Sequence, residues 1–314
     1  MNVSEFGRLI EAEVGRVIVG KQEVVAGVLA TLLAEGHVLL DDVPGVAKTL
    51  IVKSMAGSLG LRFSRVQCTP DLLPMDVTGS MVFDQRTSDF SFRPGPVFAN
   101  IVLADEINRA TPRTQSAFLE AMEERHVTVE GESHDLPTPF FVLATQNPVE
   151  HRGTFPLPEA QLDRFAVRLR VGYPTLDEEL TMLDRFHGDG SVPAARQAAG
   201  ADDVLAAQAA CRAVEISPDV AKYLAAIVRA TRERDDVVLG ASPRSTLVVM
   251  RLTQALAALD GRSFAIPDDV ATAAGMALAH RIMLRGSDTT TEGQERAIAS
   301  VLQEITVPAE TPAD

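Results

Sequence analysis

The chain has 314 residues, 46% of them apolar, which is enough for one large domain or for two domains with proper cores. Its 29 basic and 43 acidic residues give a net charge of −14, which does not suit general attraction to nucleic acid or to an anionic membrane. Cys68 and Cys211 offer neither a disulfide framework nor a metal-ligand spacing, so both are expected to be buried thiols. The N-terminus lacks the apolar region of a signal peptide, and the longest apolar run, residues 24–34, is too short to cross a bilayer. We therefore expect a cytoplasmic protein without membrane insertion.

Two helices are predicted before the first strand. Residues 4–17 have an amphipathic pattern, and Ser4 is the expected N-cap. The apolar stripe of this helix consists of Phe6, Leu9, Ile10, Val14 and Val17. Residues 21–35 predict a second helix, which Gly36 is expected to end.

The stretch from residue 37 to residue 50, HVLLDDVPGVAKTL, has the layout of a phosphate-binding loop between an apolar strand (37–41) and a helix (49–59). Backbone N–H groups at such a helix N-terminus point at phosphate oxygens, and the helix dipole adds positive potential there. Lys48 is expected to neutralise the β and γ phosphates of a nucleotide, and the Thr49 hydroxyl is expected to hold Mg²⁺. The residues expected to contact the nucleotide in this stretch are Pro44, Gly45, Val46, Ala47, Lys48, Thr49 and Leu50.

This loop departs from the strict pattern G-x-x-x-x-G-K-[ST] at two positions. Asp42 stands where the first Gly of the pattern belongs, and Ala47 stands where the second belongs. The methyl group of Ala47 is a mild change, whereas a carboxylate at position 42 is unfavourable near a triphosphate unless it points away. Taken alone, the stretch leaves open a simple Pro-Gly turn that exposes Lys48.

A second stretch favours the nucleotide interpretation. Residues 101–106, IVLADE, predict a strand buried on both faces of a parallel sheet and followed by acids. The carboxyl end of such a strand is where open α/β sheets bind ligands. Asp105 is expected to reach Mg²⁺ through water, and Glu106 is expected to polarise the water that attacks the γ-phosphate.

Two hairpins interrupt the expected alternation of strands and helices. After a strand over 61–67, the alternating runs SMVF and DFSF predict a hairpin at about 80–93. A helix over 111–125, with proline at its first position, precedes a second hairpin over 126–139. Buried strands are then predicted over 140–145 and over 166–171.

The element order predicts an α/β fold: a P-loop αβα sandwich with a parallel sheet over residues 1–172, followed by a small all-helical lid domain over 173–314. Thr175 and Glu178 form a capping box at the start of the second part. Residues 188–201 are expected to be a loose linker. Later helices are predicted at about 202–214, 218–234, 243–259 and 267–284.

Six motifs in the expected order make nearly the whole chain, from about residue 5 to 285, similar to the MoxR family of AAA+ ATPases, in its helix-2-insert clade. These motifs are DVPGVAKT at 42–49, LADEINRA at 103–110, TPRTQSAFLEAMEE at 111–124, ATQNP at 144–148, LPEAQLDRF at 157–165 and ASPRS at 241–245. The resemblance implies an ATPase that uses ATP/ADP and Mg²⁺. It also implies a homo-oligomer, usually a hexameric ring, with chaperone-like work on protein clients, among them proteins with a von Willebrand factor A domain.

The resemblance also assigns roles to single residues. Asn147 follows a buried strand and is expected to orient the attacking water together with Glu106. Arg164 resembles the arginine finger that reaches a neighbour's γ-phosphate, and Arg244 resembles the sensor arginine that closes the lid onto the nucleotide. The family's clamp on the adenine side of the nucleotide corresponds by resemblance to Ile18, Val19 and Gly20. The role of Arg109 stays open between a subunit interface and an ion pair with the next helix.

Three functions remain in competition. The first is a protein-remodelling ATPase of MoxR type. The second is another motor of the same clade, either a DNA helicase or a magnesium-chelatase subunit. The tip of the second hairpin, residues 130–135, carries three acids and no Lys or Arg, which disfavours contact with a nucleic-acid backbone. The third is a nucleotide switch that does not hydrolyse ATP, which the presence of Asp105, Glu106 and Asn147 disfavours.

Overall fold

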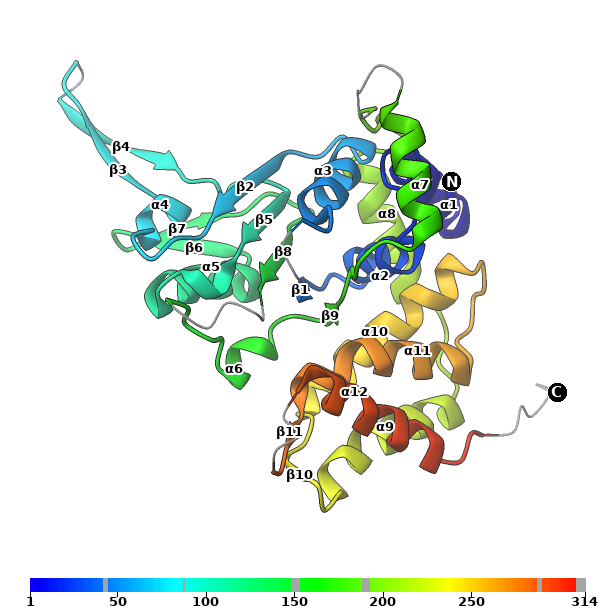
Figure 1. Ribbon diagram of the computed structural model, residues 1–314. Helices are drawn as coiled ribbons and strands as arrows, with labels where there is room; N and C mark the ends of the chain where they lie inside the picture. The colour runs from blue at the N-terminus through cyan, green and yellow to red at the C-terminus, as the bar shows by residue number, and fades with distance from the viewer. Residues whose placement is uncertain (42–44, 87, 148–152, 188–192, 287–289, 309–314) are drawn as a thin grey trace.

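The computed structural model describes residues 1–41, 45–86, 88–147, 153–187, 193–286 and 290–308. Its central sheet consists of β1 (Val38–Asp41), β2 (Phe63–Gln67), β5 (Ile101–Asp105), β8 (Phe141–Gln146) and β9 (Val167–Leu169). The strands are all parallel and lie in the order β2-β5-β8-β1-β9 (Figure 1). Their carboxyl ends therefore meet at one edge, which is the edge that the acidic strand and the phosphate loop both reach.

Alternate residues of β1, β2, β5 and β8 enter two separate hydrophobic cores. Val38 and Leu40 of β1 face a core built with the helices α1 (Val3–Val17), α2 (Gln22–Leu33) and α3 (Lys48–Ser58), while Leu39 faces the other. The second core contains Phe118 and Leu119 of α5 (Pro112–Glu124). Both faces of the sheet are thus covered, which explains the nearly continuous apolar runs of its strands.

The first helix begins earlier than the sequence predicted. Its N-cap is Asn2 and not Ser4, because the Asn2 side chain accepts a hydrogen bond from the Glu5 backbone N–H at 2.8 Å. The Glu5 carboxylate accepts the Asn2 backbone N–H in return, which completes a capping box. One residue of the predicted apolar stripe, Leu9, does not belong to the buried face of the helix, since it is 41% exposed.

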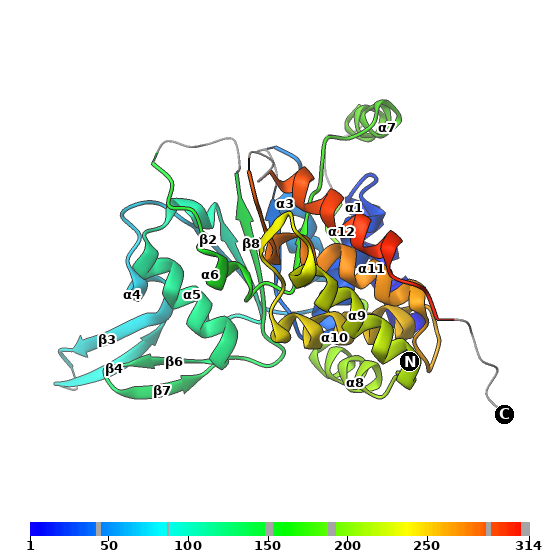
Figure 2. The same cartoon turned by 90° about the horizontal axis from the view of Figure 1, so that it is seen from below.

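Both predicted hairpins are present. The first pairs β3 (Gly79–Asp84) with β4 (Asp89–Pro94) after a short helix, α4 (Pro74–Thr78), and the second pairs β6 (His126–Val129) with β7 (Glu132–Asp135). The two hairpins extend side by side from the sandwich, away from the C-terminal helices (Figure 2). The ring of Phe92 stacks on that of His134 with 3.9 Å between centroids, so the hairpins support each other.

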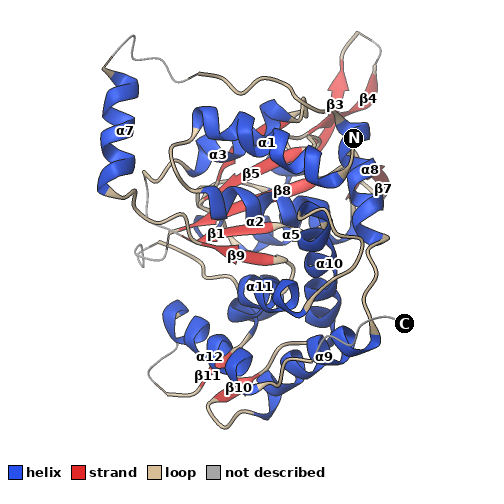
Figure 3. Ribbon diagram, turned by 90° about the vertical axis from the view of Figure 1, so that its right-hand side faces the viewer, coloured by secondary structure: helices blue, strands red, loops and turns tan. Residues whose placement is uncertain are grey.

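The sandwich also contains a 3-10 turn, η1 (Ile107–Arg109), and a one-turn helix, α6 (Glu159–Leu162). The C-terminal part that follows it is mainly helical, as expected (Figure 3). Two features were not predicted: a small antiparallel sheet and the last helix, α12. The predicted helix at 267–284 ends at Leu278 and continues as the 3-10 turn η2 (Ala279–Arg281). The remaining elements are α7 (Leu176–Phe186), α8 (Ala201–Arg212), α9 (Pro218–Glu233), β10 (Val237–Leu239), α10 (Pro243–Leu259), α11 (Pro267–Leu278), β11 (Met283–Leu284) and α12 (Thr291–Glu304).

Among the helices of the described ranges, none is both long enough and apolar enough to cross a bilayer. The α/β sandwich with a helical domain after it is confirmed. The boundary between residues 172 and 173 stays a prediction.

Two buried histidines should make the protein less stable in mild acid. His37 accepts the Val142 backbone N–H on Nδ1 at 3.0 Å and donates from Nε2 to the Met122 carbonyl at 3.1 Å. Burial, helped by the positive charge of Arg125, lowers the pKa of His37 to about 3, and burial also lowers the pKa of His280 well below 6.5. Between pH 7 and pH 5 the unfolded chain takes up these two protons and the folded chain does not. We expect His37 to lower the free energy of unfolding by about 2 kcal/mol over this interval, and His280 to act in the same direction.

Urea denaturation at pH 7 and pH 5 checks this expectation. The His37→Gln variant should lose about 2 kcal/mol less stability between the two pH values than the wild type. His187→Gln is the matched control, because His187 is exposed, and it should show the full wild-type decline. An equal decline in His37→Gln and wild type would contradict the assignment.

Candidate functional site

A pocket of about 390 Å³ lies at the carboxyl edge of the sheet and brings together residues from four distant segments of the chain. Its lining consists of Gly45, Ala47, Lys48, Thr49, Leu50, Arg65, Asp105, Glu106 and Asn147. Most of the residues expected to bind phosphate, hold magnesium or act on water are therefore in one place. Asp42 and Pro44 lie outside the described residues.

The loop reaches this pocket through unusual backbone conformations. Ala47 is the N-cap of α3 and has a φ of 62°, in the left-handed region, and Gly45 has a φ of 89°. A glycine adopts such angles more readily than an alanine, which explains why the strict motif has Gly at the position of Ala47. The first turn of α3, with Lys48 and Thr49, opens on the pocket, so its free N–H groups and its dipole favour an anion there.

Asp105 and Glu106 are held by the neighbouring strand. The Thr145 hydroxyl donates to Oδ1 of Asp105 at 2.7 Å and accepts the backbone N–H of Glu106, also at 2.7 Å. Glu106 has a φ of 57°, a strained angle for a residue with a side chain. This turn lets both consecutive acids line one pocket, although successive residues of a strand point to opposite faces.

Three polar side chains neutralise or hold the two acids. Arg65 donates to Oδ2 of Asp105 from Nη2 at 2.6 Å and from Nε at 3.1 Å. Oε2 of Glu106 accepts from Nε2 of Gln67 at 3.0 Å and from Nη1 of Arg109 at 3.1 Å. Arg109 thus turns back to Glu106 of its own turn, and its role at a subunit interface stays a prediction.

Asn147 is buried at the end of β8 and lines the same pocket. Its backbone carbonyl accepts a long hydrogen bond of 3.4 Å from Nδ2 of Asn108. Asn147 and Glu106 thus line one pocket, and the role of Asn147 in orienting a water molecule stays a prediction.

The pocket suits a magnesium ion that the nucleotide helps to hold. Thr49 and Asp105 would be its protein ligands, and the Arg65 guanidinium against Asp105 shows that this carboxylate accepts a cation. Within the described residues there is no group of three or more His, Cys, Asp or Glu side chains placed to hold a metal. Mg²⁺ commonly binds in this way, with one or two protein oxygens and with phosphate and water completing its six ligands.

An apolar pocket of about 160 Å³ adjoins the first one and shares its loop. Ile18 and Val19, two of the three residues predicted for the adenine-side clamp, line this second pocket together with Val46 and Leu50. Its other lining residues are Val17, Lys21, Gly45, Ala47, Gly172, Pro174, Met182, Arg185 and Pro193. Gly20 is placed differently, since it lines a neighbouring pocket and packs against the Glu178 side chain.

Arg164 and Arg244 are found together at the opposite end of β1. Nε of Arg164 and Nη1 of Arg244 each lie 3.0 Å from the Glu123 carboxylate, and both arginines line a pocket beside His37. Because β1 runs four residues from that end to the phosphate loop, roughly 13 Å of strand separates the two ends. Arg244 therefore lies away from the phosphate pocket of its own chain, and Arg164 pairs with Glu123, while the roles expected for both arginines stay predictions.

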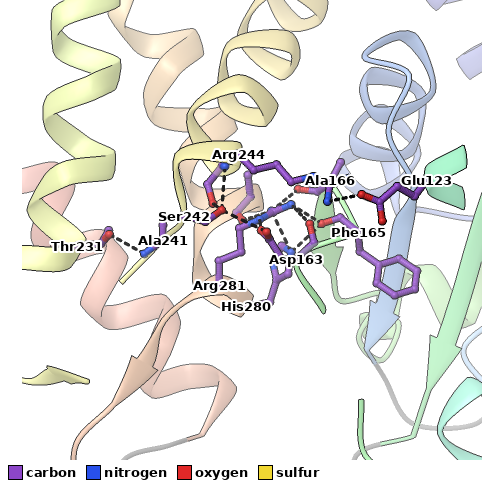
Figure 4. A network of polar contacts seen from close by, with 12 residues as sticks. Glu123, Asp163, Phe165, Ala166, Thr231, Ala241, Ser242, Arg244, His280 and Arg281 are labelled. Atoms are coloured by element: carbon purple, nitrogen blue, oxygen red, sulfur yellow. Dashed lines mark hydrogen bonds and ion pairs between the residues drawn. The ribbon is translucent and has the colours of Figure 1, made fainter. Parts of the chain in front are cut away.

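A buried arginine fixes the segment that carries Arg164 to the C-terminal helices (Figure 4). The Arg281 side chain is 1% exposed and donates to Oδ1 of Asp163 at 2.7 Å and to the Phe165 carbonyl at 2.7 Å. Asp163 also accepts from the hydroxyl of Ser242, the N-cap of α10, at 3.2 Å. Since Arg244 lies in the first turn of α10, this network sets the position of both arginines.

Comparison with known proteins decides the family. Residues 37–167 match the model of the ATPase family associated with various cellular activities (AAA), and residues 229–305 match an AAA lid domain. Chaperone MoxR1 of Mycobacterium tuberculosis is 42% identical over 306 residues, which cover 94% of this chain and 81% of the relative. The chain belongs to the MoxR family of AAA+ ATPases. The predicted family is thereby confirmed.

Two other relatives match nearly the whole length of this chain. A protein of Bacillus subtilis, YeaC, is 46% identical over 307 residues, which cover 97% of this chain and 95% of the relative. A solved structure of a protein from Cytophaga hutchinsonii is similar with a TM-score of 0.88 and 36% identity, covering 98% of this chain and 97% of that one. The sandwich and the lid thus occur together in the relatives.

Sequence reasoning missed several residues of the site. Arg65 and Gln67 stand two residues apart at the end of β2, and Thr145 stands near the end of β8. The signal that could have found them is their position, because polar side chains at the carboxyl ends of parallel strands meet at one edge. Met182 and Arg185 come from α7, and the sequence alone gave no reason to place that helix at a nucleotide pocket.

Proposed function

We propose that this MoxR-type protein binds ATP with Mg²⁺ and hydrolyses it in an oligomeric ring, and that it uses the cycle to remodel, mature or activate partner protein complexes. The observation that carries the proposal is the shared pocket of Lys48, Thr49, Asp105, Glu106 and Asn147, next to an apolar pocket of suitable chemistry for a base. A phosphate site, two acids and an amide are the groups that phosphoryl transfer to water requires.

In this proposal each group has one task. The adenine lies in the apolar pocket, and the N-terminus of α3 with Lys48 neutralises the phosphates. Bound Mg²⁺ would draw charge from the β and γ phosphates, with Thr49 and Asp105 as its protein ligands. Glu106 accepts a proton from the attacking water, and Asn147 orients that water by a hydrogen bond. Gln67 and Arg109, which hold Oε2 of Glu106, keep its carboxylate turned into the pocket.

The proposed ring explains where the two arginines lie. A cation at the far end of β1 is badly placed for the nucleotide of its own chain and suits the nucleotide of a neighbour. We therefore assign Arg164, and Arg244 beside it, to the γ-phosphate of the adjacent subunit. A hexamer, the usual number for the family, is the expected assembly, with the sandwich over 1–172 and the lid over 173–314 as its two parts.

The proposed client is a protein. MoxR1 is named a chaperone, and a partner with a von Willebrand factor A domain is one candidate. Phe83 and Phe90 at the free end of the β3–β4 hairpin are 49% and 61% exposed, with ring centroids 5.2 Å apart, and form an apolar contact for a protein segment. Phe92, in contrast, packs against Phe98 and His134 of its own chain.

A nucleic-acid motor is less favoured. Glu130, Glu132 and Asp135 surround the turn of the β6–β7 hairpin and are exposed, so the hairpin would repel a phosphate backbone. Nothing in the described pockets points to a porphyrin, so a magnesium-chelatase role has no support from the site.

Replacement of Lys48 tests the nucleotide site directly. Lys48→Ala is expected to weaken ATP binding by about 10- to 100-fold, the effect of losing a charge-assisted contact to phosphate. Isothermal titration calorimetry with Mg·ATP measures this. Lys53→Ala is the matched control, because Lys53 is an exposed lysine of the same helix outside the pocket, and it should bind like the wild type. Wild-type affinity in Lys48→Ala would place the nucleotide elsewhere.

A further inference from the structure

The helix α7 carries an apolar stripe that the described part of the chain leaves exposed. Leu176, Leu180 and Leu183 recur at helical spacing and are 72%, 51% and 66% exposed, and Tyr173 just before them is 74% exposed. No side chain of the helix is buried among those that the structure describes. Figure 3 shows α7 standing apart from the other helices. An isolated helix of 11 residues is marginal in water, so this stripe needs a partner.

The opposite side of α7 is attached to the nucleotide side of the molecule. Lys21 donates from Nζ to the Tyr173 carbonyl at 2.8 Å and lies 3.5 Å from the Glu178 carboxylate. Arg185 donates to the Arg16 carbonyl at 3.2 Å, and with Met182 it lines the apolar pocket. Whatever covers the stripe therefore lies one helix diameter from the proposed adenine site, about 10 Å away.

Acidic side chains border the stripe. At 100° per residue, Asp177 and Asp184 lie on one flank of the three leucines and Glu179 lies on the other, and all three acids are exposed. The exposed face of α7 is thus apolar along its middle and negative along both borders. This arrangement fits a surface with an apolar centre and positive borders.

Such a surface exists on the same chain, on the side of α10 that carries Arg244. We call Arg244, Leu247 and Arg251 the α10 face, because their spacing of three and four residues puts them on one side of the helix. Leu247 is 59% exposed. The side chains of Arg244 and Arg251 are 47% and 42% exposed and lie 3.0 Å from Glu123 and 3.5 Å from Glu35, so an incoming acid would share them with these carboxylates. The pocket beside them has four arginines against three carboxylates in its lining, although the whole chain is acidic.

We propose that the apolar stripe of α7 packs on the α10 face of a second copy of this chain. The inference rests on the proposed ring and identifies the surfaces that would build it. Leucines meet Leu247, and the acidic borders meet arginines, so the two faces complement each other in both polarity and charge. The same contact carries Arg164 and Arg244 of one copy toward the nucleotide side of the other, and the phosphate pocket is incomplete without them.

A cross-link between two differently labelled copies tests this pairing. One batch carries Leu180→Cys, the other carries Leu247→Cys, and they are mixed with a slowly hydrolysed ATP analogue and a short bismaleimide. The native thiols do not compete, because burial raises the pKa of both Cys68 and Cys211 to about 12. We expect a cross-linked dimer that contains one chain of each kind. Absence of this dimer in a mixture that assembles would overturn the proposal.

Sedimentation velocity supplies the second test. Leu180→Ser/Leu183→Ser should weaken assembly at least about tenfold while the variant keeps its circular dichroism spectrum and its affinity for the analogue. Val238→Ser/Leu239→Ser is the matched control, since these two residues are 56% and 50% exposed on β10, and it should assemble normally. Equal assembly of the α7 variant and the wild type overturns this contact alone. A wild type that binds the analogue and stays monomeric overturns the ring as well.

Discussion

The Glu106→Gln variant is expected to bind ATP like the wild type and to hydrolyse it at least about 100-fold more slowly. A glutamine keeps the size of the side chain and one acceptor oxygen, so the contacts from Gln67 and Arg109 can persist. It cannot take a proton from water at neutral pH. The measurements are the turnover number from phosphate release and the dissociation constant from calorimetry.

Two further variants give this result its meaning. Asn147→Ala should also slow turnover, by a smaller factor, because the Asn147 side chain is proposed to orient the water and not to accept its proton. Glu124→Gln, at an exposed position near the end of α5, removes the same charge outside the pocket and should leave turnover unchanged. An unchanged rate in Glu106→Gln would refute the assignment of the general base.

The parts of the site that could be predicted are those formed by residues close together in the sequence. The phosphate loop and the acidic strand each combine an apolar run, a turn and polar residues within about a dozen positions, and such patterns predict local structure directly. Strand alternation likewise predicted both hairpins, because the pairing partners are close in the chain.

The parts that could not be predicted depend on contacts between distant segments. Arg65 reaches Asp105 because β2 and β5 are neighbours in the sheet, although 40 positions separate the two residues. The placement of Arg244 depends on how α10 docks, through Ser242 and Asp163, on the segment before β9. Local patterns hold no information on that docking, so they could not place Arg244 relative to the phosphate pocket.

Small errors at element ends have a local cause. Ser4 and Asn2 are both good caps, and the choice between them depends on whether Glu5 reaches back to the cap residue. Within the described ranges the short strands β10 and β11 pair with each other, and their sequences contain too few residues for a pattern.

Removal of the Arg164 side chain is expected to reduce ATP turnover by on the order of 10³-fold, the lower range for loss of an arginine finger, without weakening ATP binding. The reason is position: Arg164 lies with Glu123 at the end of β1 opposite the phosphate loop, so it adds nothing to the affinity of its own pocket. Arg113→Ala, an exposed arginine in the first turn of α5, is the matched control and should keep wild-type turnover.

Mixing two inactive variants then distinguishes action on a neighbour from action within one chain. An Arg164→Ala chain retains Glu106, and a Glu106→Gln chain retains Arg164. Where a Glu106→Gln chain places its Arg164 at the pocket of an Arg164→Ala chain, that pocket has every group that hydrolysis needs. We therefore expect turnover in the mixture to exceed that of either variant alone and to rise and then fall as the ratio of the two is varied. If Arg164 acted within its own chain, every pocket in the mixture would lack either the arginine or the base, and no ratio would restore activity.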